Sequence, residues 1–280
     1  MLSAYAKPEV LEFYRTLPFN VHGDEQQNIN AILANNSVAN YPCLVPLLSS
    51  ATRVLEVGCG AGWMSNCIAH YYGAEVTAID FNSTVIEYAQ KISAAMGLDT
   101  RFLTSDLFLY SPEERFDVAV SLGVLHHTGD VARATRRISQ DFVKPGGHFL
   151  LGLYHLYGRR PFLQHFEGMR SAGADNEALF AEYRRLHSNL KDDTHLRSWF
   201  RDQVLHPHES QHTLREISEV LASANMEIVS TSINRFQDID NLDALFEREQ
   251  QLEQTSRDRL ASGSYFPGFF VVLARRSDNG

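Results

Sequence analysis

Three glycines at alternate positions, Gly58, Gly60 and Gly62, follow the short apolar run that begins at Arg53. A glycine adopts backbone angles that are closed to other residues, and without a Cβ it lets the main chain approach a ligand closely. A second β-rich run ends at Asp80, where a carboxylate can accept hydrogen bonds from both hydroxyls of a ribose. This spacing predicts a nucleotide-binding turn, although a tight strand-to-helix turn without a ligand would use the same glycines.

A second group of chemically capable side chains lies in the segment that begins at Trp199. It contains Asp202, His206, His208, Glu209 and His212. Two histidines with a carboxylate could bind a metal, and His208 and His212 would share one helical face if the next helix began that early. Plain structural packing is a third interpretation. We expect no metal here and interpret Trp199, Asp202, His206, His208 and His212 as a polar, hydrogen-bonded wall for a substrate.

These groups require an alternation of strands and helices to position them. After the first strand, near Val54, the pattern predicts strands near Val76, Phe102 and Val118 and a fifth strand over 148–154. The intervening helices are expected over 63–71, 83–96 and 131–142. Strands separated by helices of this length need right-handed crossovers and form a parallel sheet. Asn82 or Ser83 can cap the helix that follows Asp80.

The remainder of the chain extends this core. Helices are expected over 8–14, from a cap at Asp24 or Asn28 to about Asn35, and over 213–224. Strands are expected over 227–233 and 267–274. Segment 17–23 is expected to be irregular, 177–190 and 241–260 helical, and 241–260 exposed along one side. The domain assignment is a helical cap (1–47), a nucleotide-binding core (48–154), an ordered substrate lid (155–211) and the rest of the core sheet (212–280), all in a single domain.

The composition is that of an ordinary globular protein, with 280 residues, 44% hydrophobic residues and 21% charged residues. The formal charge of −9 argues against a broad phosphate-binding face. Arg159, Arg160, Arg184 and Arg185 could still form a local basic patch, although solvated surface charge explains them as well. The three cysteines have no CxxC spacing, which indicates a reducing compartment. No signal peptide or membrane span is recognised, so a cytoplasmic location is expected.

The motifs together resemble the class I S-adenosylmethionine-dependent methyltransferases, which have a Rossmann-like α/β fold. The resemblance covers roughly 53–154 and is carried by the glycine turn with Glu56, by Asp80 and Asp106, by the segment 121–127 and by the turn 144–147. It implies a seven-stranded, mostly parallel sheet with helices on both faces, in which the last strand is antiparallel and lies beside the fifth. In this family an N-terminal extension often covers the cofactor or shapes the substrate pocket, although one that only hides sheet edges is as plausible here.

The resemblance implies S-adenosylmethionine as the cofactor and S-adenosylhomocysteine as the product. Asp80 would accept from the ribose hydroxyls, Phe81 would lie against the adenine, and Asp106 would accept from the adenine amino group. The rest of the implied cofactor site surrounds the methionine part or closes the pocket, and consists of Glu56, Gly58, Cys59, Gly60, Gly62, Leu107, Ser121 and Leu122.

The resemblance also implies where methyl transfer would occur, because His126 and His127 directly follow the fourth strand. Histidine suits a general base because its ordinary pKa lies near neutrality, and a base is needed only if the nucleophile carries a proton. Structural or cofactor-flanking roles are the alternative for this pair. Tyr154 and His155, which leave the fifth strand, are the other catalytic candidates, and Tyr157 is assigned to the substrate.

A nicotinamide dehydrogenase is the main competitor on this fold, but its fingerprint requires Gly-x-Gly-x-x-Gly. Here the third glycine comes one residue early, and Glu56 and Asp106 would have no role. We therefore expect a methyltransferase acting on a small molecule through oxygen, nitrogen, sulfur or an activated carbon. A tRNA or protein methyltransferase and a non-catalytic cofactor-binding protein are the alternatives. We expect no membrane partner and no nucleic acid, and the chain could be a monomer or a homodimer.

Overall fold

The computed structural model describes residues 3–5, 7–16, 24–187 and 192–278. The segment 17–23, expected to be irregular, and the end of the expected helix 177–190 lie outside the described residues. Seven strands form one sheet in the order β3-β2-β1-β4-β5-β7-β6. Strands β1 to β5 pair in parallel, and β7 pairs antiparallel with both β5 and β6. The expected sheet and its antiparallel last strand beside the fifth are confirmed.

The strand bounds agree closely with the apolar runs of the sequence. The strands are β1 (Arg53–Val57), β2 (Glu75–Asp80), β3 (Arg101–Thr104), β4 (Phe116–Leu122), β5 (Val143–Tyr154), β6 (Met226–Thr231) and β7 (Phe269–Arg276). The fifth strand is longer than expected, because it begins at Val143 and includes the predicted turn 144–147. Its register against β4 shifts between Phe116 and Val118, so the two glycines of this turn lie in an irregularity of the ladder.

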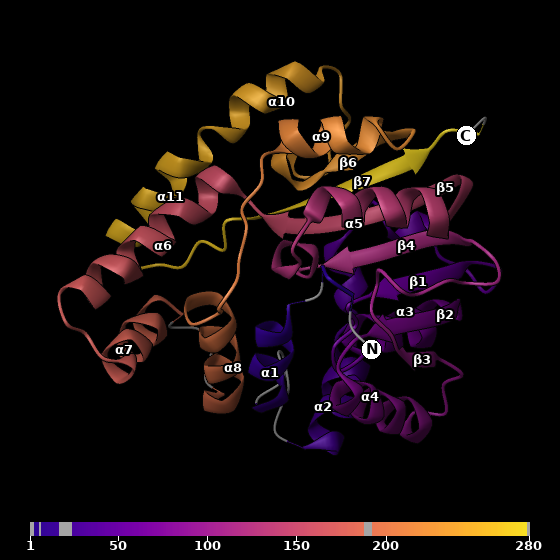
Figure 1. Ribbon diagram of the computed structural model, residues 1–280, viewed down its shortest axis with the longest axis horizontal. Coiled ribbons are helices and arrows are strands. Elements are labelled where there is room, and N and C mark those ends of the chain that lie inside the picture. The colour runs from indigo at the N-terminus through magenta and orange to yellow at the C-terminus, as the bar shows by residue number, and fades with distance from the viewer. Residues whose placement is uncertain (1–2, 6, 17–23, 188–191, 279–280) are drawn as a thin grey trace.

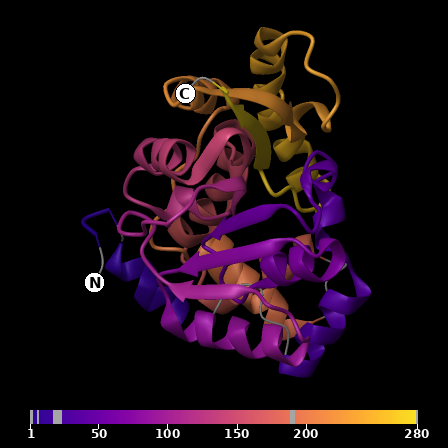
Figure 2. The same ribbon diagram turned by 90° about the vertical axis from the view of Figure 1, so that its right-hand side faces the viewer.

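Helices cover both faces of the sheet (Figures 1 and 2). On one face, side chains of α2 (Glu25–Ala34), α3 (Trp63–Tyr72) and α4 (Ser83–Ala95) share a hydrophobic core with β1, β2 and β4. On the other, α5 (Val131–Arg137), the π-helical turn η4 (Ile138–Phe142), α9 (Leu214–Ala222) and α10 (Leu242–Glu249) share a second core with the sheet. Short 3₁₀ turns span Ser37–Asn40, Val45–Leu47, Leu125–His127 and Ser232–Asn234.

Three helices after β5 pack around a hydrophobic core of their own. They are α6 (Leu156–Ser171), α7 (Asn176–Leu186) and α8 (Asp193–Val204), and they form the arm at the left of Figure 1. Rings of Phe162, Phe180 and Phe200, one from each helix, meet in this core. Helix α1 (Pro8–Thr16) lies beside α8, and the Arg201 guanidinium donates to the carbonyl of Phe13.

The segment 241–260 is helical and exposed along one side, as expected, but it forms two helices, α10 and α11 (Leu252–Ala261). Helix α10 buries Leu245 and Phe246, and α11 packs along α6. The helix after the histidine segment begins at Leu214, so His208 and His212 share no helical face. Among the described residues, no helix is both long and apolar enough to cross a membrane.

The glycine turn after β1 is needed for two different physical reasons. Gly58, Gly60 and Gly62 all have positive φ angles, of 75°, 50° and 76°, which favour glycine. A Cβ on Gly62 would lie 2.7 Å from Cζ of Phe102 and 2.8 Å from Cβ of Ala89, whereas a Cβ on Gly60 would meet nothing within 4 Å. Gly62 therefore permits close packing of α3 on the sheet, and Gly60 presents bare main chain to open space.

This difference predicts unequal effects of alanine at the two positions. Gly62→Ala adds overpacking to left-handed backbone strain and should lower the free energy of unfolding by about 3 kcal/mol. Gly60→Ala has only the strain and should lower it by about 1 kcal/mol. Urea denaturation of both variants measures the difference, and equal losses would contradict the packing role of Gly62.

Candidate functional site

A cavity of about 620 Å³ opens at the carboxyl ends of strands β1 to β4. In open α/β sheets this edge is where ligands bind. Most of the predicted cofactor residues line the cavity: Glu56, Gly58, Cys59, Gly60, Asp80, Phe81, Asp106, Leu107 and Leu122. Helix α1, helix α8 and the segment before β7 contribute the opposite wall, so one cavity joins the glycine turn to the lid.

Asp80 is buried at the end of β2 and is held by the glycine turn. The Gly60 N–H donates to its Oδ2 at 3.0 Å, and the Asn82 N–H donates to its Oδ1 at 2.9 Å. The pKa of Asp80 is raised because burial disfavours the charged form, and the backbone donors oppose only part of that rise. Each carboxylate oxygen can accept a second hydrogen bond, so a ribose with two hydroxyls would meet a carboxylate of fixed orientation.

Glu56 lines the same end of the cavity and is the next-to-last residue of β1. The Ser65 hydroxyl of α3 donates to its carboxyl group. Burial raises the pKa of Glu56 to about 8, against a smaller lowering by the Ser65 bonds. Glu56 is therefore mainly protonated at pH 7 and would ionise only when a positive charge arrives beside it.

Asp106 follows β3 and is contacted by the beginning of the chain. Its Oδ1 accepts from the Phe108 N–H at 2.8 Å and its Oδ2 from the Ser3 N–H at 2.7 Å. Tyr5 packs on the Phe108 ring and its carbonyl accepts from the Gly129 N–H. The N-terminal segment thus crosses the part of the cavity at which adenine was expected.

Two predicted cofactor residues, Gly62 and Ser121, do not line the cavity. Gly62 is the N-cap residue of α3 and packs closely against Phe102 and Ala89. The Ser121 side chain is fully buried in β4, where its hydroxyl donates to the Val57 carbonyl at 3.1 Å. The alternating direction of side chains along a strand explains why the neighbouring Leu122 reaches the cavity.

Asp202 of α8 is the centre of the cavity wall that faces the glycine turn. It is buried and accepts hydrogen bonds from the hydroxyls of Tyr14 and Tyr154, the latter at 3.2 Å. Burial raises the pKa of Asp202 and, together with the Asp202 charge, raises the pKa of both phenols. Helix α1, strand β5 and the lid therefore meet at one carboxylate.

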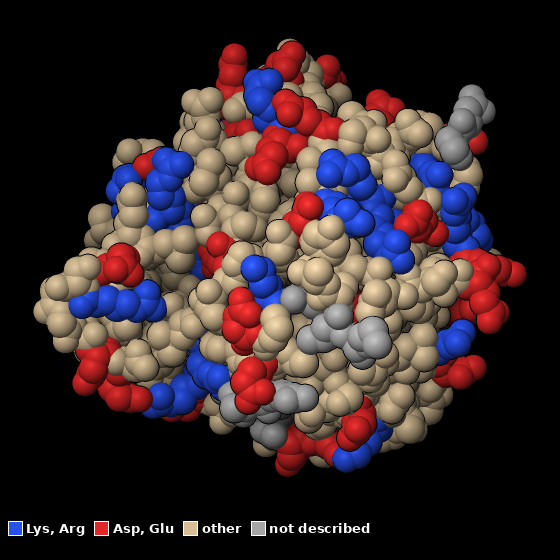
Figure 3. Space-filling view, viewed as in Figure 1, with Lys and Arg blue, Asp and Glu red and all other residues tan. Residues whose placement is uncertain are grey.

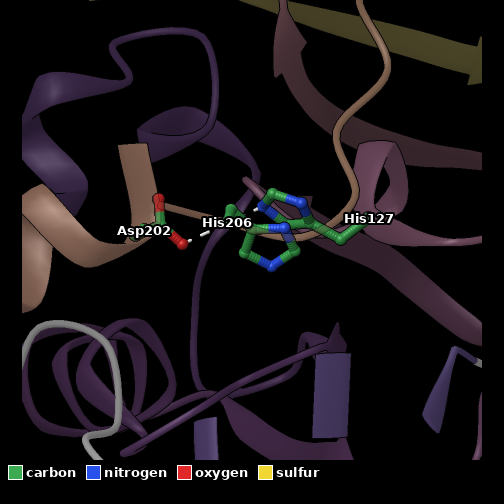
Figure 4. A group of neighbouring side chains, drawn as sticks. All are labelled: His127, Asp202 and His206. Carbon is green, nitrogen blue, oxygen red and sulfur yellow. Dashed lines mark ion pairs between the residues drawn. The ribbon is translucent and has the colours of Figure 1, made fainter. Parts of the chain in front are cut away.

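His127 lies in the turn after β4 and lines the same wall (Figure 4). Its Nδ1–H donates to the His208 carbonyl at 2.8 Å, which leaves a lone pair on Nε2. Nε2 is buried, has no hydrogen-bond partner among the described residues, and lies 3.9 Å from Oδ1 of Asp202. Burial lowers the pKa of His127 to about 4, so the ring is neutral at pH 7.

His206 stacks on His127 with ring centroids 3.7 Å apart, but it does not line the cavity. One ligand atom from each of His127, Asp202 and His206 lies within 4.8 Å of the others. His206 Nδ1 accepts from the His208 N–H at 3.1 Å, so the neutral ring carries its proton on Nε2 and has no lone pair left for a metal. Donors on a tetrahedral zinc ion would also lie about 3.3 Å apart, closer than the 3.9 Å between His127 and Asp202.

The other predicted catalytic histidines lie behind the wall and not on it. His126 Nδ1 accepts from the Tyr154 N–H at 3.3 Å, and its ring stacks on Tyr154. His155 uses Nδ1 to cap α6 and places Nε2 2.8 Å from the Glu249 carboxylate. Neither lines the cavity. Both support the residues that do, and the geometry gives them no contact with a ligand.

The remaining predicted substrate residues divide in the same way. Trp199 and Asp202 line the cavity, whereas Tyr157, His208 and His212 do not. His208 bonds the Thr128 carbonyl through Nε2 at 3.0 Å, and His212 bonds Ser210 and Glu216. The histidine segment therefore fastens the lid to the ends of β4 and β5.

Several cavity residues were missed by the sequence reasoning. They are Lys7, Val10, Tyr14, Asn40, Tyr41, Gln203, Ser232, Phe236, Tyr265 and Phe269, among others. Gln203 directly follows the predicted site residue Asp202, and this neighbour was the signal that could have identified it. Tyr14 is 188 residues from Asp202 in the sequence, and no local pattern marks it or Tyr265.

The possible basic patch of four arginines is not assembled. Arg159 is fully buried and pairs with Glu209, while Arg160, Arg184 and Arg185 pair with Glu253, Asp193 and Glu182. On the face shown in Figure 3, basic and acidic side chains are interspersed. These four arginines therefore provide no open basic groove for nucleic acid.

The strand order, the glycine turn and the acidic strand ends define a class I S-adenosylmethionine-dependent methyltransferase fold. Residues 54–147 match the family model described as a methyltransferase domain. The matched residues contain the glycine turn, Asp80 and Asp106, and this methyltransferase domain agrees with S-adenosylmethionine as the cofactor.

Individual relatives are similar in sequence to different shares of this chain. A ubiquinone biosynthesis O-methyltransferase of Alkalilimnicola ehrlichii is 35% identical over 100 residues, which cover 35% of this chain and 40% of that protein. An uncharacterized protein of a Synechococcus species is 26% identical over 74% of this chain and 56% of its own length. The chain thus spans less than two thirds of either relative.

Solved structures match the fold over most of the chain. The magnesium protoporphyrin IX methyltransferase of Synechocystis PCC 6803 with bound S-adenosylhomocysteine has a TM-score of 0.55 at 15% identity, over 95% of this chain and 94% of its own. PKMT2 of Rickettsia typhi in complex with the same product has a TM-score of 0.58 at 15% identity, over 88% of this chain and 54% of its own.

The lowered pKa of His127 predicts a pH dependence of stability. Its ordinary pKa is 6.5 and its folded value is about 4, so between these values the unfolded chain binds a proton that the folded chain does not. Stability must therefore fall as the pH decreases through this window. His127→Gln should reduce the loss of unfolding free energy between pH 7 and pH 5 by about 2 kcal/mol.

Urea denaturation at both pH values measures this effect. His165→Gln is the matched control, because His165 bonds Glu182 at 2.8 Å on the lid surface and lies outside the cavity lining. If His127→Gln kept the wild-type pH dependence, the neutral state of His127 would be contradicted.

Proposed function

We propose that the protein transfers a methyl group from S-adenosylmethionine to a small molecule bound between His127, Asp202 and Tyr14. One observation carries this proposal: a single cavity joins the glycine turn and Asp80 to the wall formed by Asp202 and His127. The cavity volume of about 620 Å³ is in the range of small-molecule binding sites. The sequence relatives include ubiquinone biosynthesis O-methyltransferases, which agrees with a small acceptor.

The residues at the sheet edge fit the cofactor. Gly60 exposes bare main chain where a Cβ would meet nothing, and Asp80 presents a fixed carboxylate to a ribose. Phe81 lines the cavity beside Asp80 and would lie against the adenine, with Asp106 beyond it. Glu56 would face the methionine part, with Leu122 on the other side. The cofactor, when bound, supplies a methyl group on a positively charged sulfur, which is a good leaving group.

The wall around Asp202 would hold the acceptor and exclude water. Aromatic rings of Tyr14, Tyr154, Trp199 and Tyr265 line this part of the cavity together with Asp202. Holding a nucleophile in line with the methyl group can supply much of the rate enhancement. The lid contributes Trp199 and Asp202, and α1 contributes Tyr14, so both would order the acceptor.

His127 would accept the proton that the nucleophile releases. Its ring lines the cavity and is fixed by the His208 carbonyl, which leaves the lone pair on the buried Nε2. The Asp202 carboxylate, 3.9 Å away, would stabilise the imidazolium that forms. This gives His127 the role of general base and Asp202 a supporting electrostatic role.

Asp80→Ala tests the cofactor site. Losing a charged acceptor for two ribose hydroxyls should weaken binding of S-adenosylhomocysteine about 100-fold or more. Titration calorimetry measures this, with circular dichroism to verify the fold and Asp99→Ala, an exposed aspartate outside the cavity, as the control. Wild-type protein that ignores both S-adenosylmethionine and S-adenosylhomocysteine would overturn the proposed function.

The raised pKa of Glu56 predicts a proton release on cofactor binding. With a pKa of about 8, Glu56 carries a proton at pH 7, and a nearby methionine ammonium would favour its charged form. Binding of S-adenosylhomocysteine should therefore release roughly one proton per protein. Calorimetry in phosphate and in Tris, whose ionisation enthalpies differ, measures it. Glu56→Gln should abolish the buffer dependence and Glu75→Gln should retain it; no buffer dependence in wild-type protein would place Glu56 away from the ammonium.

A further inference from the structure

The Tyr41 hydroxyl is a hydrogen-bonding group that is available to a ligand. Tyr41 lines the cavity, and its ring is half-buried. Within the described part of the chain its hydroxyl forms no hydrogen bond, and unlike Nε2 of His127 it is not enclosed by protein atoms. A tyrosine hydroxyl can both donate and accept a hydrogen bond. Tyr41 can therefore bond to a molecule in the cavity without giving up an existing contact.

The segment before Tyr41 runs along helix α3 from its end to its beginning. The Asn36 amide donates to the hydroxyl of Tyr72, the last residue of the helix, at 2.9 Å. The Ser37 hydroxyl then donates to Sγ of Cys67, in the middle of the helix, at 3.3 Å. The 3₁₀ turn Ser37–Asn40 packs on α3 and continues in the same direction. Tyr41 is thereby brought to the first turn of α3, beside the glycine turn.

This position sets Tyr41 against the same end of the cavity as Glu56. The first turn of α3 contains Ser65, whose hydroxyl donates to the Glu56 carboxyl group. Burial and, to a smaller extent, the Glu56 charge raise the pKa of the Tyr41 phenol. The phenol therefore keeps its proton at pH 7. Tyr41 is a neutral hydrogen-bond donor within electrostatic reach of Glu56.

The cofactor would bring a carboxylate to this end of the cavity. The ammonium and the carboxylate of a methionine are bonded to the same carbon, and the carboxylate is ionised at pH 7. If Glu56 faces the ammonium, the carboxylate must lie beside it, within reach of the neighbours of Glu56. A carboxylate that leaves water without gaining hydrogen bonds is costly. This end of the cavity therefore needs a donor for it.

No basic side chain supplies that donor. Among the described residues that line the cavity, Lys7 is the only lysine or arginine. A Cβ on Gly129 would lie 3.5 Å from Cε of Lys7, and the Gly129 N–H bonds the carbonyl of Tyr5, which packs on Phe108. Lys7 thus lies on the Asp106 side of the cavity, where adenine is expected. The carboxylate depends on neutral donors, and a hydrogen bond from a neutral donor to a charged acceptor is a strong one.

We propose that the Tyr41 hydroxyl donates a hydrogen bond to the carboxylate of the methionine part of S-adenosylmethionine. This inference rests on the proposed function and deepens it, because it adds a positioning residue to the cofactor site. Glu56 would hold the ammonium and Tyr41 the carboxylate, so both charged substituents of one carbon are fixed. The short chain that carries the sulfur would then be directed toward the wall around Asp202. The N-terminal part of the chain would bind the cofactor as well as cover the sheet.

Two ligands that differ only in the carboxylate test this inference on the whole chain. Decarboxylated S-adenosylhomocysteine keeps the ammonium and lacks the carboxylate. In titration calorimetry, Tyr41→Phe should weaken binding of S-adenosylhomocysteine at least about tenfold, but should change binding of the decarboxylated ligand by less than about twofold. Tyr72→Phe is the matched control, because it removes a hydroxyl that contacts the same segment outside the cavity. It should leave both affinities at the wild-type values.

The outcomes separate this inference from the proposed function. If Tyr41→Phe binds S-adenosylhomocysteine as tightly as the wild-type protein, or loses affinity for both ligands equally, the contact with the carboxylate is overturned and methyl transfer stands. Retained affinity for the decarboxylated ligand shows that Tyr41→Phe has folded. If the wild-type protein binds only the complete ligand, the carboxylate is required, and adenosine replaces the decarboxylated ligand as the reference. Failure of the wild-type protein to bind S-adenosylhomocysteine would instead defeat the proposed function.

Discussion

The contact of two tyrosines with the Asp202 carboxylate organises the whole site. Tyr14 comes from the N-terminal helix, Tyr154 from the end of β5, and Asp202 from the lid. A buried carboxylate is costly unless it is hydrogen-bonded, so the three parts of the chain are stabilised only when all of them meet. The acceptor wall, formed by Asp202, Tyr14 and Tyr154 with His127, therefore exists only when the N-terminal helix, the sheet and the lid are together.

The charge behind this wall is balanced by a second buried pair. Arg159 is fully buried, donates to Glu209 through Nε and Nη2, and lies with its guanidinium 4.0 Å from the centroid of the Tyr154 ring. Glu209 belongs to the same segment as His208, whose carbonyl fixes the His127 ring. The segment between α8 and α9 thus sets both the electrostatics around Tyr154 and the tautomer of His127.

The sequence predicted the sheet and most of the residues that line the cavity at the sheet edge, because both depend on local patterns. Apolar runs, glycine spacing and strand-end aspartates mark β1 to β4, and the residues after those strands share one edge in any parallel sheet. The acceptor wall was only partly predicted, because it is made by contacts between distant segments. His127 and Asp202 were found from residue type, but their partner Tyr14 carries no local signal.

The positions of the histidines relative to the cavity could not be predicted for a related reason. A residue type suited to chemistry is equally suited to capping a helix or bonding a buried carboxylate, and the sequence does not distinguish these uses. His155 caps α6 and pairs with Glu249, which itself accepts from the Leu214 N–H at the start of α9. That carboxylate lies in α10, beyond the reach of any pattern read around position 155.

The position of β7 has a consequence for how the nascent chain acquires its fold. β7 is the last strand in the chain, yet it lies between β5 and β6. Until β7 has been synthesised, β5 has one unpaired edge and β6 has no partner in the sheet. Unpaired strand edges are templates for aggregation. During synthesis, the parallel strands can assemble early, but the sheet is completed only when the residues of β7 are available.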